Sequence, residues 1–240
     1  MLVFGAHPDD IELGCAGTII STIHAGKKVG VVDLTKGELG TRGNAIIRAK
    51  EAKKSATILG LSVRENLNLA DGFFEINKKN ILKVIQIIRN YQPSIILANA
   101  PTDRHPDHGR AANLLYEAFF LSGLEKIKTT FKRNTQPAWK PTYLFNYIQD
   151  KYIEPNILID ISDYIDKKVE SINAYSSQFY NATNKSNEPS TYISTPQFLQ
   201  SILHRNGLFG KRIGVNFAEG FLTSKIIGLS NFNSIIQNIR

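Results

Sequence analysis

The 240-residue sequence has very little cysteine and no long hydrophobic run. Its single cysteine, Cys15, excludes an intrachain disulfide framework and a metal site built from several cysteines. No apolar run approaches the ~18 residues that cross a membrane, and no charged-then-apolar signal peptide opens the chain. We therefore expect a soluble, cytoplasmic protein with no membrane partner.

Acidic residues are also fewer than basic ones. Asp and Glu number 21 against 29 Lys and Arg, which gives a formal net charge of +8. A basic surface can attract nucleic acid, but here the excess is mostly scattered lysine without the interleaved aromatic residues of nucleic-acid-binding surfaces. We therefore expect no nucleic-acid partner. The composition is that of a globular protein, and because no linker or repeat interrupts it, we expect a single domain over residues 1–240.

Short β-branched runs alternate with amphipathic segments over the first 110 residues, as they do in βαβ units. This pattern predicts an α/β fold of the Rossmann-like kind, a mostly parallel sheet with helices on both faces. A sheet order of 3-2-1-4 would make the first and fourth strands neighbours. The predicted strands cover 1–5, 29–34, 63–67, 94–98, 142–147, 157–161 and 215–217. The predicted helices cover 13–25, 44–59, 109–122 and 162–175, and a further helix starts near 196. Apolar residues at helical spacing over 81–88 predict a helix that Pro93 ends, and the same spacing recurs over 232–239.

Histidine and aspartate gather in two loops, one after the first predicted strand and one after the fourth. Residues 6–10 read Ala-His-Pro-Asp-Asp, and residues 103–108 read Asp-Arg-His-Pro-Asp-His. Because ligands of such sheets bind where the carboxyl ends of these two strands meet, the side chains of both loops should converge. The acidic first turn would repel the phosphate of a dinucleotide, so it favours a cation instead.

Two imidazoles and one carboxylate form a set of three ligands that leaves a fourth metal position open for water. We assign this set to His7, Asp10 and His108. Zinc suits the mixed nitrogen and oxygen donors best, and Fe²⁺, which uses the same ligand types, is the alternative in the cell. The plainer interpretation, in which these residues only cap the following helix, does not explain why a second turn, rich in histidine, follows the neighbouring strand.

Three residues of the two loops remain for roles other than binding the metal. Asp9 can take a proton from an attacking water, and His105 can stabilise an oxyanion or protonate the leaving group. Asp107 can orient a histidine through its second ring nitrogen.

The two loops resemble the signature motifs of the LmbE/PIG-L family of metal-dependent deacetylases, which act on molecules that contain N-acetylglucosamine. Segments 35–43, 48–60 and 217–221 are similar to the family too, so the resemblance covers essentially the whole chain. It implies zinc at the three ligands named above, Asp9 as base and His105 as oxyanion stabiliser or acid. The sequence is most similar to the bacillithiol-pathway branch, which hydrolyses the acetamide of N-acetylglucosaminyl malate. The resemblance also implies a homo-oligomer, with the hexamer as a frequent form.

Two arginines, Arg42 and Arg104, lie on the loops that follow the second and fourth strands. A malyl glucosaminide is a small anionic substrate with two carboxylates, which arginine binds in a bidentate way. We expect Arg42 to bind the malyl group and Arg104 to line the site. Asp103 stands where some relatives have a tyrosine, so the sequence identifies no tyrosine for oxyanion binding.

Other functions are compatible with the same residues. The nearest is deacetylation of a different amide, such as diacetylchitobiose or a free amino sugar. A second is a catalytically silent carbohydrate- or metal-binding protein, which would have no need of Asp9 as an unligated base. A third is a non-haem iron oxygenase, which metal analysis and an oxygen-consumption assay would distinguish.

Overall fold

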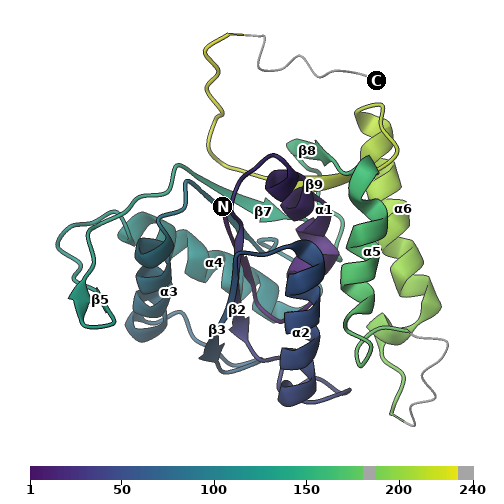
Figure 1. Ribbon diagram of the computed structural model, residues 1–240, viewed down its shortest axis with the longest axis horizontal. Helices are drawn as coiled ribbons and strands as arrows, with labels where there is room; N and C mark the ends of the chain where they lie inside the picture. The colour runs from purple at the N-terminus through teal and green to yellow at the C-terminus, as the bar shows by residue number, and fades with distance from the viewer. Residues whose placement is uncertain (181–187, 232–240) are drawn as a thin grey trace.

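The computed structural model describes residues 1–180 and 188–231, so the helix predicted over 232–239 lies outside the described residues (Figure 1). Seven strands form the central sheet, namely β1 (Leu2–Gly5), β2 (Gly30–Thr35), β3 (Val63–Leu69), β4 (Ile95–Ala98), β7 (Tyr143–Tyr147), β8 (Ile157–Asp160) and β9 (Ala218–Leu222). Their order is β3-β2-β1-β4-β7-β9-β8. Only the two pairings that involve β9 are antiparallel, which confirms the mostly parallel sheet and its 3-2-1-4 half.

Helices cover both faces of this sheet, as predicted. Figure 1 shows α3 (Lys78–Tyr91) and α4 (Pro106–Leu121) on one side and α1 (Asp10–His24), α2 (Ala45–Leu59) and α5 (Ile165–Asn173) on the other, with α6 (Pro196–Arg212) beside α5. Alternate residues of β1 serve the two faces. Phe4 packs in the core cluster that contains α3 and α4, whereas Val3 packs in the cluster that contains α1. Burial on both sides explains why β1 and β4 contain no polar side chain.

The remaining elements are short. Two turns of 3₁₀ helix, η1 (Ser162–Tyr164) and η2 (Tyr192–Ser194), precede α5 and α6. A small antiparallel hairpin of β5 (Thr130–Phe131) and β6 (Asn134–Thr135) stands apart from the main sheet. Within the described part of the chain, no helix combines the length and the apolar character needed to cross a membrane.

Several predicted boundaries are wrong, and two of them matter for the site. Helix α4 begins at Pro106 rather than at residue 109, because proline is well suited to the first helical position and His105 caps it. The last strand is β9, not 215–217. Gly214 turns the chain at φ 75° after α6, and Val215 packs against a small cluster before the strand begins. Asp107 and His108 therefore lie in a helical turn, where their spacing is fixed.

Candidate metal centre

The turn after β1 holds Asp9 in a strained conformation. Asp9 is the N-cap of α1 with a φ of 113°, a left-handed value that is uncommon for a residue other than glycine, and its side chain makes no capping hydrogen bond. Its carboxylate lies instead 2.7 Å from Nη2 of Arg48. Such strain is typical of functional sites. Helix capping therefore does not account for Asp9.

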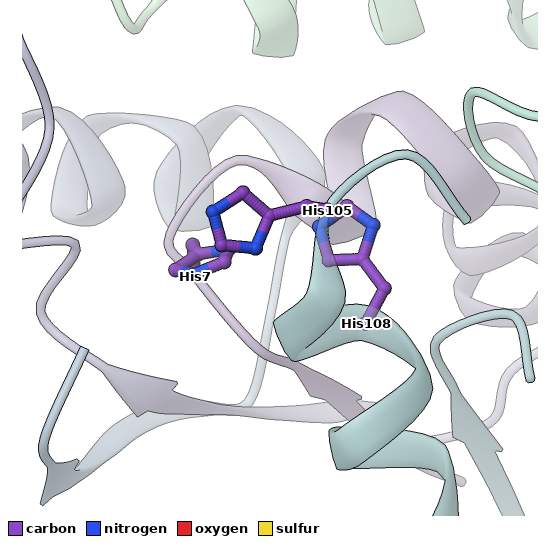
Figure 2. Close-up of side chains that lie close together, drawn as sticks. All are labelled: His7, His105 and His108. Atoms are coloured by element: carbon purple, nitrogen blue, oxygen red, sulfur yellow. The ribbon is translucent and has the colours of Figure 1, made fainter. Parts of the chain in front are cut away.

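Three histidines from the two loops converge above the ends of β1 and β4. Figure 2 shows His105 and His108, from the start of α4, close to His7 on the turn after β1. The ring centroid of His7 is 4.6 Å from that of His105 and 5.6 Å from that of His108. One ligand atom of each lies within 4.8 Å of the others, close enough to hold a metal ion together.

The Asp10 carboxylate lies between two of these histidines. Its Oδ2 is 3.6 Å from Nδ1 of His7, and its Oδ1 is 3.1 Å from Nε2 of His108. Side-chain amides also donate to it, from Asn99 at 2.9 Å and Gln149 at 2.6 Å. Burial alone would raise the pKa of Asp10, but the charge and hydrogen bonds of His108 and His7 lower it well below its usual range. Asp10 is therefore an anion that faces both imidazoles.

The second nitrogen of each ring contacts a further carboxylate. Nε2 of His7 is 3.0 Å from Oδ1 of Asp71 and 3.2 Å from Oδ2 of the fully buried Asp107. Nδ1 of His108 is 2.6 Å from Oδ2 of Asp103. Such carboxylates fix ring orientation and tautomer in metal sites. They leave Nδ1 of His7 and Nε2 of His108 directed at Asp10.

This donor set fits a divalent metal ion. Two imidazole nitrogens and a carboxylate oxygen are ligands that zinc and Fe²⁺ accept. Burial would lower the pKa of both histidines, but their acidic partners outweigh it. The charge of Asp10 raises the pKa of His108 to about 9, and hydrogen bonds to Asp10, Asp107 and Asp71 raise that of His7. A cation would therefore replace protons here. His7, Asp71 and Asp107 form a second group with ligand spacing, also centred on His7.

Asp9 and His105 flank the cluster with properties suited to proton transfer. Burial raises the pKa of Asp9 to about 7, although the charge of Arg48 holds it down in part. Burial and the charges of His7 and His108 lower the pKa of His105. Because Nδ1 of His105 accepts a hydrogen bond from the Asp107 amide at 3.2 Å, the neutral ring carries its proton on Nε2.

A pocket of about 590 Å³ joins these groups to the two predicted arginines. All the residues assigned from the sequence line it except Asp107, which lies behind His7. Arg104 lies on its wall with Nε 2.9 Å from Asp150 and its guanidinium 4.7 Å from the ring centroid of Tyr192. Arg42 has its Nε 3.6 Å from Glu188.

Sequence reasoning gave no role to five residues that contact or line the site, namely Arg48, Asp71, Asp103, Gln149 and Arg205. Asp71 offered a signal, since it follows the carboxyl end of β3 at the same edge of the sheet. Its neighbour Gly72 makes Asp-Gly look like an ordinary turn. Arg205 stands near the end of the chain on α6, and nothing local to it indicates that it lines the pocket.

Comparison with known proteins finds similarity to deacetylases. A model of the family described as GlcNAc-PI de-N-acetylase matches residues 2–119. Diacetylchitobiose deacetylase of Thermococcus kodakarensis is 29% identical over 231 residues, which cover 92% of this chain and 81% of that protein. The probable N-acetyl-alpha-D-glucosaminyl L-malate deacetylase 2 of Bacillus anthracis is 28% identical over 192 residues, which cover 75% of this chain and 81% of that protein.

Among solved structures, a conserved protein of Thermus thermophilus superposes with a TM-score of 0.83. It is 32% identical in sequence, and the match covers 95% of this chain and 96% of that one. The similarity therefore extends over the whole architecture, beyond the region that carries the two histidine motifs.

Proposed function

Because the chain belongs to the PIG-L/LmbE family of N-deacetylases, we propose that it hydrolyses the acetamide of N-acetylglucosaminyl malate in bacillithiol biosynthesis and releases acetate. The chain is an N-deacetylase hydrolase, and substrates that contain N-acetylglucosamine are those of its relatives. The observation that carries the proposal is the buried base Asp9 beside the His7, Asp10 and His108 cluster, within a pocket that arginines line.

We propose zinc as the metal, with Fe²⁺ as the alternative, held by His7, Asp10 and His108. When bound there, a divalent ion activates water and polarises the acetyl carbonyl. Asp71, Asp103 and Asp107 would keep the two imidazoles in the orientation that the ligand set needs.

Asp9 is the group that would take the proton of the attacking water. A pKa of about 7 is close to the value that lets a carboxylate accept a proton and then release it at neutral pH. Arg48 contributes by holding the carboxylate at 2.7 Å and by favouring its anionic form. Because the Asp9 backbone is fixed in its strained turn, the base has little freedom to leave this position.

His105 would act on the opposite side of the acetyl group. Its Nε2–H can donate to the oxygen that becomes negative during attack, or to the amine that leaves. Its lowered pKa keeps the ring neutral at pH 7, and the contact between the Asp107 amide and Nδ1 selects the tautomer with a donor at Nε2.

The substrate's sugar and aglycone would occupy the rest of the pocket. Arg42 and Arg104 stand on its wall, where their charges suit the carboxylates of a malyl group. We also propose that the protein is a cytoplasmic homo-oligomer, with the hexamer as the form to test by sedimentation. Diacetylchitobiose is the second candidate substrate, since its deacetylase is a relative over 92% of the chain.

Acetate release from three substrates tests the proposal. N-Acetylglucosaminyl malate, N-acetylglucosamine and diacetylchitobiose should be compared, each with zinc-loaded and Fe²⁺-loaded protein. We expect the highest kcat/KM with the malyl glucosaminide. A preference for diacetylchitobiose would replace the first substrate by the second, and no acetate from any of them would support the silent binding protein.

A further inference from the structure

Arg205 lies in the same pocket as the histidines but is incompletely bonded to the protein. The side chain comes from α6, is partly buried and lines the pocket. Its Nη2 donates to the Leu13 carbonyl at 2.9 Å, whereas its buried Nε has no hydrogen-bond partner. Over residues 1–180 and 188–231, no carboxylate forms an ion pair with it. Its guanidinium is therefore in the pocket without a carboxylate of the described residues in contact with it.

Two carboxylates, Glu219 and Asp150, raise the pKa of Arg205 through their charge, but each is already bonded to other donors. Glu219 accepts from Lys168 Nζ at 2.6 Å and from the Thr18 amide at 2.8 Å. Asp150 accepts from Arg104 at 2.9 Å and from Tyr192 at 3.0 Å. These groups do not neutralise the Arg205 guanidinium by contact.

Two cations share the Leu13 carbonyl, and only one of them has a carboxylate partner within the described residues. It accepts from both Arg205 Nη2 and Lys168 Nζ, at 2.9 Å and 3.0 Å, while Glu219 pairs directly with Lys168 alone. Burial lowers the pKa of Arg205 to about 10, because the charges of Glu219 and Asp150 offset only part of the desolvation. Arg205 is still cationic at neutral pH.

The two arginines predicted from the sequence differ from Arg205 in this respect. The Nε of Arg42 also lacks a hydrogen bond in the described part of the chain, but Arg42 lies 3.6 Å from Glu188 and Arg104 is paired with Asp150. A ligand carboxylate would compete with a carboxylate of the protein at each of them. At Arg205 there is no such competitor among the described residues. Apolar side chains beside it in the pocket, such as Phe198 and Ile202, would strengthen an ion pair by excluding water.

We propose that Arg205 forms an anion subsite that binds a carboxylate on the aglycone of the substrate. Its place in the pocket fits this role. Arg205 donates to the Leu13 carbonyl, three residues after Asp10 in α1, so it contacts the same helix that carries a proposed metal ligand. Because Arg205 and the three proposed ligands line one pocket, a sugar could present its acetamide to the metal centre and its aglycone to α6. The inference rests on the proposed function and adds a residue that selects acidic glucosaminides over neutral ones.

Binding to the metal-free protein tests the subsite separately from catalysis. Calorimetric titration with N-acetylglucosaminyl malate and with diacetylchitobiose gives a ratio of the two dissociation constants. In Arg205→Met the preference for the malyl compound should fall by roughly tenfold to a hundredfold, the usual effect of losing a hydrogen bond to a charged group. Arg205→Lys should retain part of the preference. Arg212→Met is the matched control, since Arg212 ends the same helix outside the pocket and pairs with Glu154.

The outcomes are distinct. If Arg205 only supports α1 through Leu13, Arg205→Met weakens both ligands equally, and an unchanged ratio overturns the subsite. Acetate release by the zinc-loaded wild type from the same two compounds is measured in parallel. If the wild type releases acetate but the binding ratio is unchanged in Arg205→Met, the proposed function is supported and only the subsite is rejected. A lost preference without any acetate release supports the subsite and rejects the hydrolase.

Discussion

The Asp103 carboxylate lies 2.6 Å from Nδ1 of His108, while Nε2 of the same ring lies 3.1 Å from Asp10. The Asp103 carboxylate thus fixes the orientation of the His108 ring, and Asp10 contacts the other nitrogen of that ring. The relationship explains why an aspartate at position 103 is useful in a chain that has no tyrosine there. It also makes Asp103 a positioning residue for the proposed metal ligand.

Asp103→Asn should weaken metal binding by roughly tenfold to a hundredfold, the usual cost of losing a carboxylate behind a ligating histidine. The amide keeps the shape and can still accept from the Lys151 amide, so the fold should be retained. Competition titration with a chromophoric chelator measures the affinity. Asp163→Asn, an exposed change away from the pocket, is the control. Equal metal affinity in Asp103→Asn and Asp163→Asn would show that Asp103 does not position His108 for metal binding.

Asp9→Asn should lower kcat by about 10² to 10⁴ without loss of bound metal, because it preserves shape while removing the base. Acetate release and metal content are measured on the same sample. Full kcat in this variant would contradict the assignment of Asp9 as base.

The acid limb of kcat/KM should follow the ionisation of Asp9. The base works only when deprotonated, so activity is lost as the pH falls through its pKa. The charge of Arg48 lowers that pKa, and therefore Arg48→Met should move the acid limb to higher pH. Arg48→Lys keeps a positive charge and should keep the limb near its wild-type position. A limb that stays in place in Arg48→Met would show that another group controls it.

Glu219→Gln should destabilise the fold by roughly 3–5 kcal/mol, because it leaves the fully buried Lys168 without its partner. Glu219 also accepts from the Gly17 and Thr18 amides, which follow the interruption of α1 at Cys15. Urea unfolding followed by circular dichroism measures the loss. Glu154→Gln removes an exposed ion pair with Arg212 and should leave the midpoint nearly unchanged. Similar shifts in the two variants would mean that the buried pair contributes little.

Residue patterns were sufficient for the architecture of the first half and for the convergence of the two histidine loops. Short apolar, β-branched runs predicted β1 and β4, and the strand order then brought His7 close to His108 although about 100 residues separate them. The partners of these histidines were not predictable in the same way. Asp71 reaches His7 from two strands away, and the pairing of Asp103 depends on the rotamer of His108.

The contact that Arg205 makes in the pocket was not predictable from the sequence either. Arg205 meets Leu13 across 192 positions of sequence, through the packing of α6 beside the rest of the molecule. Local propensity places Arg205 on a helix but does not say what that helix faces. Polar contacts between distant elements therefore come from the structure alone.

Acetate release from N-acetylglucosaminyl malate, measured on one preparation before and after metal removal, tests whether the deacetylase depends on the proposed metal. Chelated, dialysed protein should lose at least nine-tenths of its activity, on the order expected when the water-activating ion is absent, and one equivalent of zinc should restore it. The His108→Ala variant should not bind the one equivalent of zinc, and it should be inactive with or without added zinc. Metal-free protein that releases acetate as fast as the zinc-loaded protein would show that the reaction needs no metal at this site.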